Sequence, residues 1–316
     1  MSATENRLAV LFPGQGSQEK GMGRALAETS AEAAELWRLA EKASGLSLRE
    51  IYWEGDEAAM ADTRALQPAM TAVTLGLWYF LQSKLSSAVG FAGHSLGEYA
   101  ALAASGMLEV PAVLDLTSLR GRLMAEAAGG DGKMAAVLKL SLDAIEDVVR
   151  EAAETTGKIL LIANYNSPGQ YVISGEAGAV AAAADLVKER KGRAVPLAVS
   201  GAFHSPLMAE PAAELEKALR KAGLRAPSRG PVFFNVTGAA EPGADKALAL
   251  MCRQMTSQVR WIDTMANLWK AGARTFVELG PKGVLTKLLA ANLKDAGEPY
   301  TGLSVADPAG AAGLEA

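Results

Sequence analysis

The clearest chemical signal in the sequence lies at residues 93–97, where Gly-His-Ser-Leu-Gly matches the pattern Gly-x-Ser-x-Gly. A short apolar run ends at Ala92 and an alanine-rich helical pattern begins at Leu96, so these residues must turn the chain from a strand into a helix. In such a turn the serine is strained and exposed, and the glycines let neighbouring backbone pack where a Cβ would clash. The first N–H groups of the helix point toward the atom that the serine attacks. The pattern therefore predicts a nucleophilic Ser95, with a purely structural turn as the alternative.

A serine nucleophile needs a base, and the chain has only two histidines, His94 and His204. His94 adjoins Ser95 in the turn, so we expect its side chain to point away from the hydroxyl and to be packed or hydrogen-bonded. His204 lies at a loop-to-helix junction and is the base by elimination, with a helix-capping or surface histidine as the alternative. With Cys252 as the only cysteine, soft ligands are too few for a zinc site built on histidine and cysteine.

A serine hydrolase of this type would carry an acid between its serine and its histidine in chain order. None of the aspartates in this interval stands at a strand end, since each lies on an expected helix or on a surface; they are Asp115, Asp131, Asp143, Asp147 and Asp185. A neutral carbonyl is the alternative partner for His204. It would fix the tautomer without burying a negative charge beside an anionic substrate.

Arg120 lies on the apolar stripe of an expected helix, four residues from both Leu116 and Met124. An arginine in that position needs a partner. Spacing alone leaves two interpretations open. One is a ligand site, and the other is an arginine that extends past the stripe or pairs with a structural carboxylate.

A second glycine-rich turn, Pro-Gly-Gln-Gly-Ser-Gln at residues 13–18, follows a buried strand. It fails both nucleotide-binding patterns, because Glu19 replaces the third glycine of the dinucleotide motif and Met22 stands where a phosphate loop needs lysine. We therefore predict a turn of exposed backbone N–H groups beside the serine.

The elements that must position these residues follow from hydrophobic periodicity. Strands alternate with helices along most of the chain, which favours a mostly parallel sheet covered on both faces. The expected strands cover residues 8–12, a run ending at 92, 231–236 and 275–279, and the expected helices cover about 22–43, 67–85, 111–127, 207–222, 246–255, 262–271 and 284–293. Pro68 is expected in the first turn of its helix, and the Ala/Gly-rich tail beyond Asp307 is expected to be disordered.

Residues 129–200 follow a different order, namely strand, helix, strand, strand, helix, strand. This order is typical of the ferredoxin-like unit, whose ends lie close together. We therefore predict an α/β protein with an inserted ferredoxin-like (βαββαβ) small domain at 129–200. A discontinuous catalytic domain, 1–128 and 201–316, would carry the mostly parallel sheet.

Composition excludes several classes of function. The 316 residues are 50% hydrophobic and carry a net charge of −4, without a basic block interleaved with aromatics, so nucleic acid is not an expected partner. No apolar run approaches the roughly 20 residues that span a bilayer, and no signal-like segment opens the chain. Together with a single cysteine, these features predict a cytoplasmic protein without a membrane segment. We also expect a monomer.

Seven motifs then occur in an order that resembles malonyl-CoA:acyl carrier protein transacylases, including the acyltransferase domains of fatty acid and polyketide synthases. They are Leu-Phe-Pro-Gly-Gln-Gly-Ser-Gln (11–18), Gln-Pro (67–68), Gly-His-Ser-Leu-Gly-Glu (93–98), Arg120-Gly121 with Met124, Asn-Ser-Pro-Gly-Gln (166–170), Gly-Ala-Phe-His-Ser (201–205) and Val-Glu-Leu-Gly-Pro (277–281). The resemblance covers nearly the whole chain. It implies an α/β-hydrolase-like core with an inserted ferredoxin-like domain.

Position by position, the resemblance implies that Ser95 is the nucleophile and His204 the base. It implies an oxyanion hole formed by the backbone N–H groups of Gln15 and Leu96. Gln254 matches the glutamine whose carbonyl orients the histidine.

The resemblance also implies how the substrate is selected. Arg120 matches the arginine that binds the free carboxylate of malonate, and its planar fork suits that group. Phe203 would crowd the methyl group of methylmalonate, and Leu96 is similarly the malonyl-type residue.

The implied function is transfer of the malonyl group from malonyl-CoA to the phosphopantetheine thiol of acyl carrier protein through a malonyl-serine, without a metal or redox cofactor. A polyketide carrier protein is an alternative acceptor. A serine esterase or thioesterase, and a non-catalytic carrier-protein-binding module, are the alternative activities. An acidic carrier protein would suit the basic residues Lys188, Arg190, Lys191 and Arg193, which are equally consistent with a solvated helix face.

Overall fold

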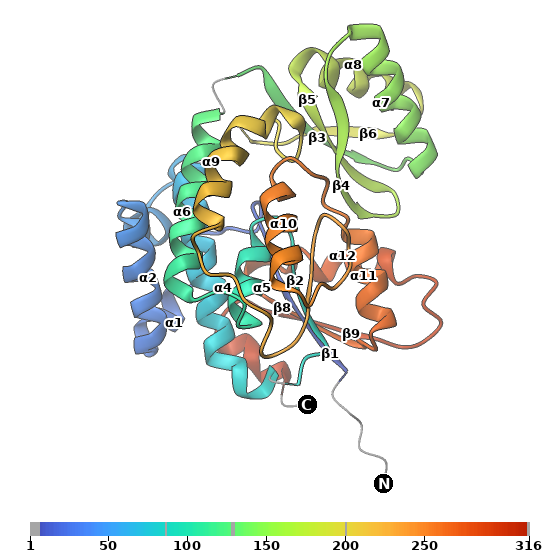
Figure 1. Ribbon diagram of the computed structural model, residues 1–316. Helices are drawn as coiled ribbons and strands as arrows, with labels where there is room; N and C mark the ends of the chain where they lie inside the picture. Colours follow the sequence, from blue (N-terminus) through green and yellow to red (C-terminus); the bar gives the residue numbers. More distant parts are fainter. Residues whose placement is uncertain (1–6, 86, 128–129, 200, 315–316) are drawn as a thin grey trace.

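A computed structural model describes residues 7–85, 87–127, 130–199 and 201–314 of the chain. Its larger sheet has the strand order β7-β2-β1-β8-β9, and every pair of neighbours is parallel. The strands are β1 (Leu8–Phe12), β2 (Gly90–Gly93), β7 (Val232–Phe233), β8 (Thr275–Leu279) and β9 (Thr301–Val305). This arrangement confirms the predicted mostly parallel sheet (Figure 1).

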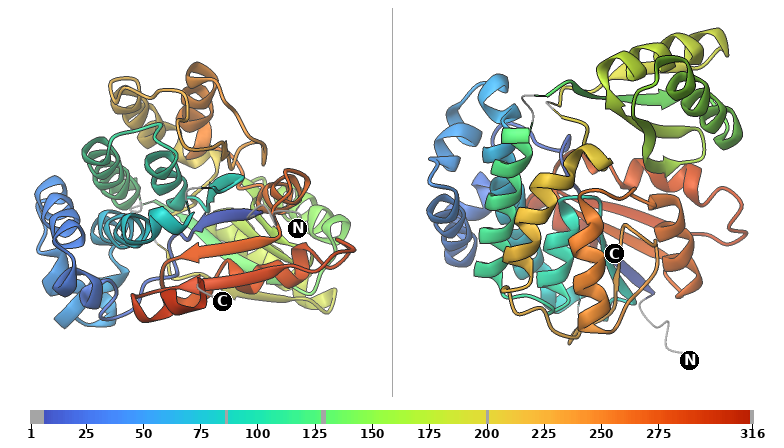
Figure 2. Two further views of the ribbon diagram at one scale, coloured as in Figure 1. Left: turned by 90° about the horizontal axis from the view of Figure 1, so that it is seen from below. Right: turned by 45° about the horizontal axis from the view of Figure 1, so that its top comes forward.

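Strand β1 shows why helices cover both faces of this sheet. Successive side chains of a strand point to opposite faces, and all five residues of β1 are buried. Leu8, Val10 and Phe12 belong to one apolar cluster, whereas Ala9 and Leu11 belong to another. Each face of the strand therefore needs its own layer of helices, as the two views of Figure 2 show.

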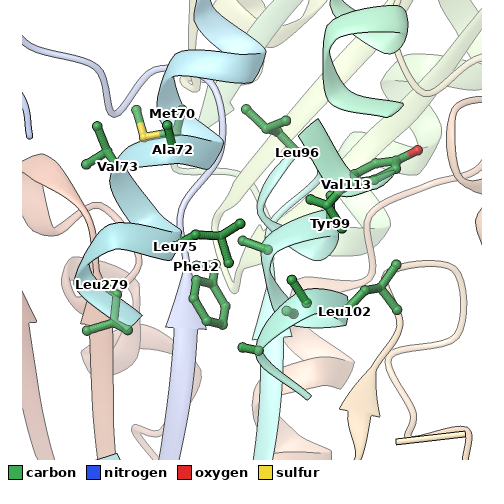
Figure 3. Close-up of a cluster of buried hydrophobic side chains, with 14 of the residues drawn as sticks. Phe12, Met70, Ala72, Val73, Leu75, Leu96, Tyr99, Leu102, Val113 and Leu279 are labelled. Atoms are coloured by element: carbon green, nitrogen blue, oxygen red, sulfur yellow. The ribbon is translucent and has the colours of Figure 1, made fainter. Parts of the chain in front are cut away.

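Most helices supply the cluster on the Phe12 face. They are α1 (Arg24–Thr29), α2 (Ala31–Ser44), α4 (Thr63–Leu85), α5 (Gly97–Ala104), α6 (Val110–Glu126), α9 (Ala209–Leu219) and α10 (Ala244–Gln254), with α11 (Trp261–Lys270) and α12 (Thr286–Asn292) on the other face. Shorter segments are η1 (Glu50–Glu54), α3 (Glu57–Ala61), η3 (Pro206–Met208), η4 (Pro281–Gly283) and η5 (Ala309–Leu314). Figure 3 shows Phe12 at the end of β1 next to Leu75 of α4, with α5, which carries Leu102, on the other side. This packing fixes the end of β1 next to the start of α5.

Two predicted helices differ from the observed ones because of capping residues. The helix expected over 22–43 is divided at Ser30, which ends α1 and caps α2 by accepting the N–H of Ala33. Helix α4 begins at Thr63 rather than near Gln67, because the Asp62 carbonyl accepts the first helical hydrogen bonds. Pro68 therefore lies inside the helix, and the prediction that it occupies the first turn was wrong.

The C-terminal part holds two further differences. Strand β9 was not predicted. It lies at the edge of the sheet, where four of its five residues are not buried, so its sequence lacks the apolar run of a buried strand. Disorder was expected beyond Asp307, but residues 309–314 form η5, where Ala311 is buried against the main cluster.

A second, antiparallel sheet has the order β4-β5-β3-β6. Its elements run β3 (Gly132–Leu138), α7 (Leu142–Thr156), β4 (Leu160–Ser167), β5 (Gln170–Glu176), α8 (Ala177–Glu189) and β6 (Arg193–Pro196), the order that the sequence predicts. The predicted boundaries at 128–129 and 200 lie outside the described residues.

Strand β4 joins the small sheet to the larger body. Val259 donates to the Ala163 carbonyl at 2.8 Å and accepts from the Tyr165 N–H at 2.9 Å, so the segment before α11 pairs with β4.

None of the helices in the described part of the chain combines the length and the hydrophobicity that a membrane-spanning helix needs.

Candidate active site

The turn at residues 93–97 connects β2 with α5, as the strand-to-helix prediction requires. Ser95 has a φ of 51°, a left-handed conformation that costs a non-glycine residue of order 1–3 kcal/mol. Asn235 holds the turn from the loop after β7: its Oδ1 accepts the Ser95 N–H at 2.7 Å and its Nδ2 donates to the Gly93 carbonyl at 2.7 Å. The strain is therefore maintained by hydrogen bonds from a distant segment.

Close backbone approach explains both glycines of the turn. A Cβ on Gly93 would lie 1.9 Å from the Gly97 carbonyl carbon, and a Cβ on Gly97 would lie 2.0 Å from the Phe12 carbonyl oxygen. The second contact places the turn directly against the end of β1.

We expect Gly97→Ala to destabilise the fold by about 3 kcal/mol or more, because the added methyl meets backbone that cannot move without shifting β1. The matched control is Gly76→Ala in α4, where the nearest atoms are at 3.5 Å and alanine should be tolerated. Thermal unfolding of both variants measures the difference. Equal stability of the two would contradict this account of the turn.

His204 lies against the serine: its Nε2 is 2.7 Å from Ser95 Oγ. Its Nδ1 faces two backbone carbonyls, Gln254 at 3.1 Å and Ser257 at 3.0 Å. Two acceptors at Nδ1 require the proton on that nitrogen, so Nε2 carries the lone pair and accepts from the serine hydroxyl. The neutral-carbonyl alternative to a triad acid is therefore the arrangement present.

The environment keeps the imidazole neutral. His204 is 4% exposed, and its burial together with the nearby Arg120 and His94 lowers its pKa from 6.5 to about 3. The imidazole is therefore available as a base across the neutral pH range.

Arg120 is 1% exposed and lies at the centre of the site. Its Nη2 donates to Ser95 Oγ at 3.1 Å and to Gln254 Oε1 at 3.2 Å, and its Nη1 donates to Gln67 Oε1 at 2.9 Å. The structure thus excludes the interpretation of an arginine that extends to solvent. A cation stands within hydrogen-bond distance of the serine hydroxyl.

The turn at 13–18 lies beside the serine turn. A Cβ on Gly14 would lie 2.5 Å from the His94 carbonyl oxygen and 3.7 Å from the Leu96 nitrogen. Among the described residues, no acceptor takes the backbone N–H of Gln15 or of Leu96. These N–H groups remain available for an oxyanion.

Of the two remaining predicted side chains, His94 is half-buried and Phe203 is buried. His94 Nε2 donates to Asn166 Oδ1 at 2.8 Å and the ring packs edge-on against Trp261, which confirms a packed, hydrogen-bonded histidine. Phe203 is 5% exposed in the main apolar cluster.

Comparison with known proteins agrees with this site. The model of the acyl transferase domain family matches residues 10–310. The chain belongs to that family. It is 39% identical to a malonyl CoA-acyl carrier protein transacylase of Synechocystis over 297 residues, which cover 92% of this chain and 97% of the relative.

Solved structures give the same relationship for this acyl transferase. An acyl carrier protein S-malonyltransferase of Vibrio cholerae superposes with a TM-score of 0.90 at 36% identity, covering 98% of this chain and 99% of the other. A malonyl-transacylase in complex with its type II PKS acyl carrier protein superposes with a TM-score of 0.90 at 34% identity, covering 97% of this chain and 98% of the other.

Sequence reasoning missed four residues of the acyl transferase site or assigned them no role: Gln67, Glu98, Asn235 and Ser257. Gln67 and Glu98 occur within motifs quoted above, so their presence was visible but their partners were not. Asn235 and Ser257 carry no local signal. Their contacts depend on how β7 and the segment after α10 reach the serine turn.

Proposed function

We propose that this acyl transferase moves the malonyl group from malonyl-CoA to the phosphopantetheine thiol of acyl carrier protein through a malonyl ester of Ser95. One observation carries the proposal: a fully buried guanidinium donates to the hydroxyl of the nucleophile. A cation in this place suits an acyl group with its own carboxylate, because charge-assisted hydrogen bonds to a planar fork are strong and directional.

In the first step the Ser95 hydroxyl oxygen forms a bond to the thioester carbonyl carbon, while His204 Nε2 takes its proton. The carbonyl oxygen becomes an oxyanion facing the N–H groups of Gln15 and Leu96, each of which supplies about 3 to 4 kcal/mol of barrier reduction. The carbon–sulfur bond then breaks, and the imidazolium protonates the leaving CoA thiolate. The malonyl ester of Ser95 remains.

In the second step the carrier-protein thiol gives its proton to His204 Nε2 and its sulfur forms a bond to the ester carbonyl carbon. The ester oxygen leaves and takes the proton back from the imidazolium, so that the enzyme returns to its starting state. The Gln254 and Ser257 carbonyls support the imidazolium in both steps, since each accepts from Nδ1.

Substrate charge assists this cycle. Arg120 is one of the groups that lower the pKa of His204. A malonyl carboxylate on Arg120 offsets that effect, so the histidine becomes a stronger base when the correct acyl group is bound. Phe203 and Leu96 are proposed to favour malonyl over methylmalonyl by limiting space.

The experiment is an acyl-CoA panel with a defined holo carrier protein, followed by intact mass. We expect malonyl transfer to exceed acetyl and methylmalonyl transfer, and hydrolysis without transfer to be slow. Rapid steady hydrolysis of neutral esters without transfer would favour an esterase. Absence of any acyl-serine would favour a non-catalytic carrier-binding module.

Several finer points are part of the same proposal. We propose an α/β-hydrolase-like core formed by 1–128 and 201–316 with an inserted ferredoxin-like domain at 129–200, supported by the parallel sheet and by the β4-β5-β3-β6 order. A cytoplasmic location, a monomeric state and the choice between fatty acid and polyketide carrier proteins stay predictions. Of the four basic residues considered for contact with a carrier protein, Arg190 is already engaged, since it pairs with Glu151 and donates to the Ala144 carbonyl.

A further inference from the structure

The guanidinium of Arg120 is a buried cation whose direct partners are all neutral. It donates to a serine hydroxyl and to the side-chain oxygens of Gln67 and Gln254. In the described part of the chain its hydrogen-bond acceptors include no carboxylate, and its Nε has no hydrogen-bond partner. A buried charge in this state needs compensation from farther away.

The compensating group is Glu98, which is 1% exposed in the first turn of α5. Its Oε1 accepts the Asn235 N–H at 2.7 Å, and its Oε2 accepts from Gln254 Nε2 at 2.6 Å. The other end of the same amide, Gln254 Oε1, accepts from Arg120 Nη2. One carboxamide therefore connects the buried acid with the buried base.

The direction of the Gln254 amide decides whether this connection works. Its NH₂ group faces two acceptors, Glu98 Oε2 and the Ser95 carbonyl at 2.8 Å, and its oxygen faces Arg120. An amide turned by 180° would set its NH₂ against the guanidinium and leave donors facing donors. The two acceptors together set the productive direction, and Glu98 is the one that a side-chain substitution can remove.

We propose that Glu98 is a positioning residue that acts through the Gln254 amide, holding the Arg120 fork on the Ser95 hydroxyl. Gln254 also accepts from His204 through its backbone carbonyl. Gln254 therefore contacts the cation through its side chain and the base through its backbone. This inference rests on the proposed function, because its consequence is the discrimination of malonyl from neutral acyl groups.

Protonation of Glu98 should disturb the Gln254 amide, since a protonated carboxyl carries an O–H donor that can face the NH₂ group of Gln254. Burial raises the pKa of Glu98 from 4.5 to about 7, opposed by its bonds to Asn235 and Gln254 and by the charge of Arg120. Arg120 and the neighbouring Tyr99 are the titratable groups that interact with it. The carboxylate is ionised above this pKa, so kcat/KM for malonyl-CoA should fall as the pH decreases through about 7. We call this fall of kcat/KM the acid limb of the pH profile. His204 stays neutral over the same pH range, so its titration does not cause the acid limb.

The test is Glu98→Gln, which keeps the shape but can present NH₂ to Gln254. We expect kcat/KM for malonyl-CoA to fall roughly 10- to 100-fold, the range of coupling between contacting residues in one network. Acetyl transfer should fall less, and the acid limb near pH 7 should disappear. Glu98→Asp, which remains a pure acceptor, should keep the limb.

The matched control is Glu278→Gln, a buried glutamate whose Oε2 accepts from the N–H and hydroxyl of Thr286. It should lose thermal stability yet retain the acid limb and the malonyl preference. A Glu98→Gln enzyme with an unchanged limb and unchanged preference would overturn the inference. Failure of the proposed function itself is distinct, because the wild-type enzyme would then form no malonyl-serine.

Discussion

Ser95→Ala should leave no malonyl mass on the protein after incubation with malonyl-CoA, whereas the wild-type enzyme should carry one malonyl group on the peptide that contains Ser95. The reason is chemical: the hydroxyl is the atom that forms the ester, and it lies 2.7 Å from His204 Nε2 and 3.1 Å from Arg120 Nη2. Loss of a nucleophile of this type lowers kcat on the order of 10⁶-fold in serine enzymes. Intact mass followed by peptide mapping measures the adduct, and transfer to holo carrier protein measures the rate.

The matched control for this variant is Ser118→Ala, since Ser118 is a buried serine on α6 whose hydroxyl has no partner in the described chain. It should retain the adduct. An adduct on another residue, or transfer by the Ser95→Ala enzyme at the wild-type rate, would remove Ser95 from the role of nucleophile.

Arg120→Ala should reduce kcat/KM for malonyl-CoA roughly 100-fold, which corresponds to a loss of about 3 kcal/mol of transition-state stabilisation. Acetyl transfer should fall far less. The guanidinium offers Nη2 at the serine hydroxyl, where the acyl group must sit, and a neutral acyl group has no carboxylate to use it. The KM for malonyl-CoA should carry much of the loss. Initial rates with both acyl-CoA substrates measure the ratio.

Two comparisons separate this effect from simple loss of stability. Arg120→Lys keeps the charge but not the fork, so it should recover only part of the malonyl preference. Arg122→Ala, on the same helix, removes an exposed arginine that pairs with Glu126, and it should leave both activities unchanged. Equal losses of malonyl and acetyl transfer in Arg120→Ala would refute carboxylate recognition by this residue.

The sequence by itself determined the features that depend on neighbours in the chain or on counting. The turn at 93–97 could be predicted because the steric need for glycine acts within two residues of the serine. His204 could be predicted as the base because the chain has only one other histidine. The parallel sheet followed from apolar runs such as Leu8–Phe12, since strands covered on both faces lose the alternation of a half-exposed strand. The edge strand β9 was missed because it lacks that signal.

The tertiary structure decided which side chains complete the site. Ser95 meets His204 across 109 residues, Asn235 across 140 and the Gln254 amide across 159. Contacts between residues so far apart in the sequence depend on where β7, α6 and α10 end in space. The local preference of a residue for helix or strand carries no information about these positions. The same reason left Arg120 open between two interpretations until its neutral partners were known. Glu98 was visible as a residue of a motif, but its function depends on the direction of one amide that only the folded chain sets.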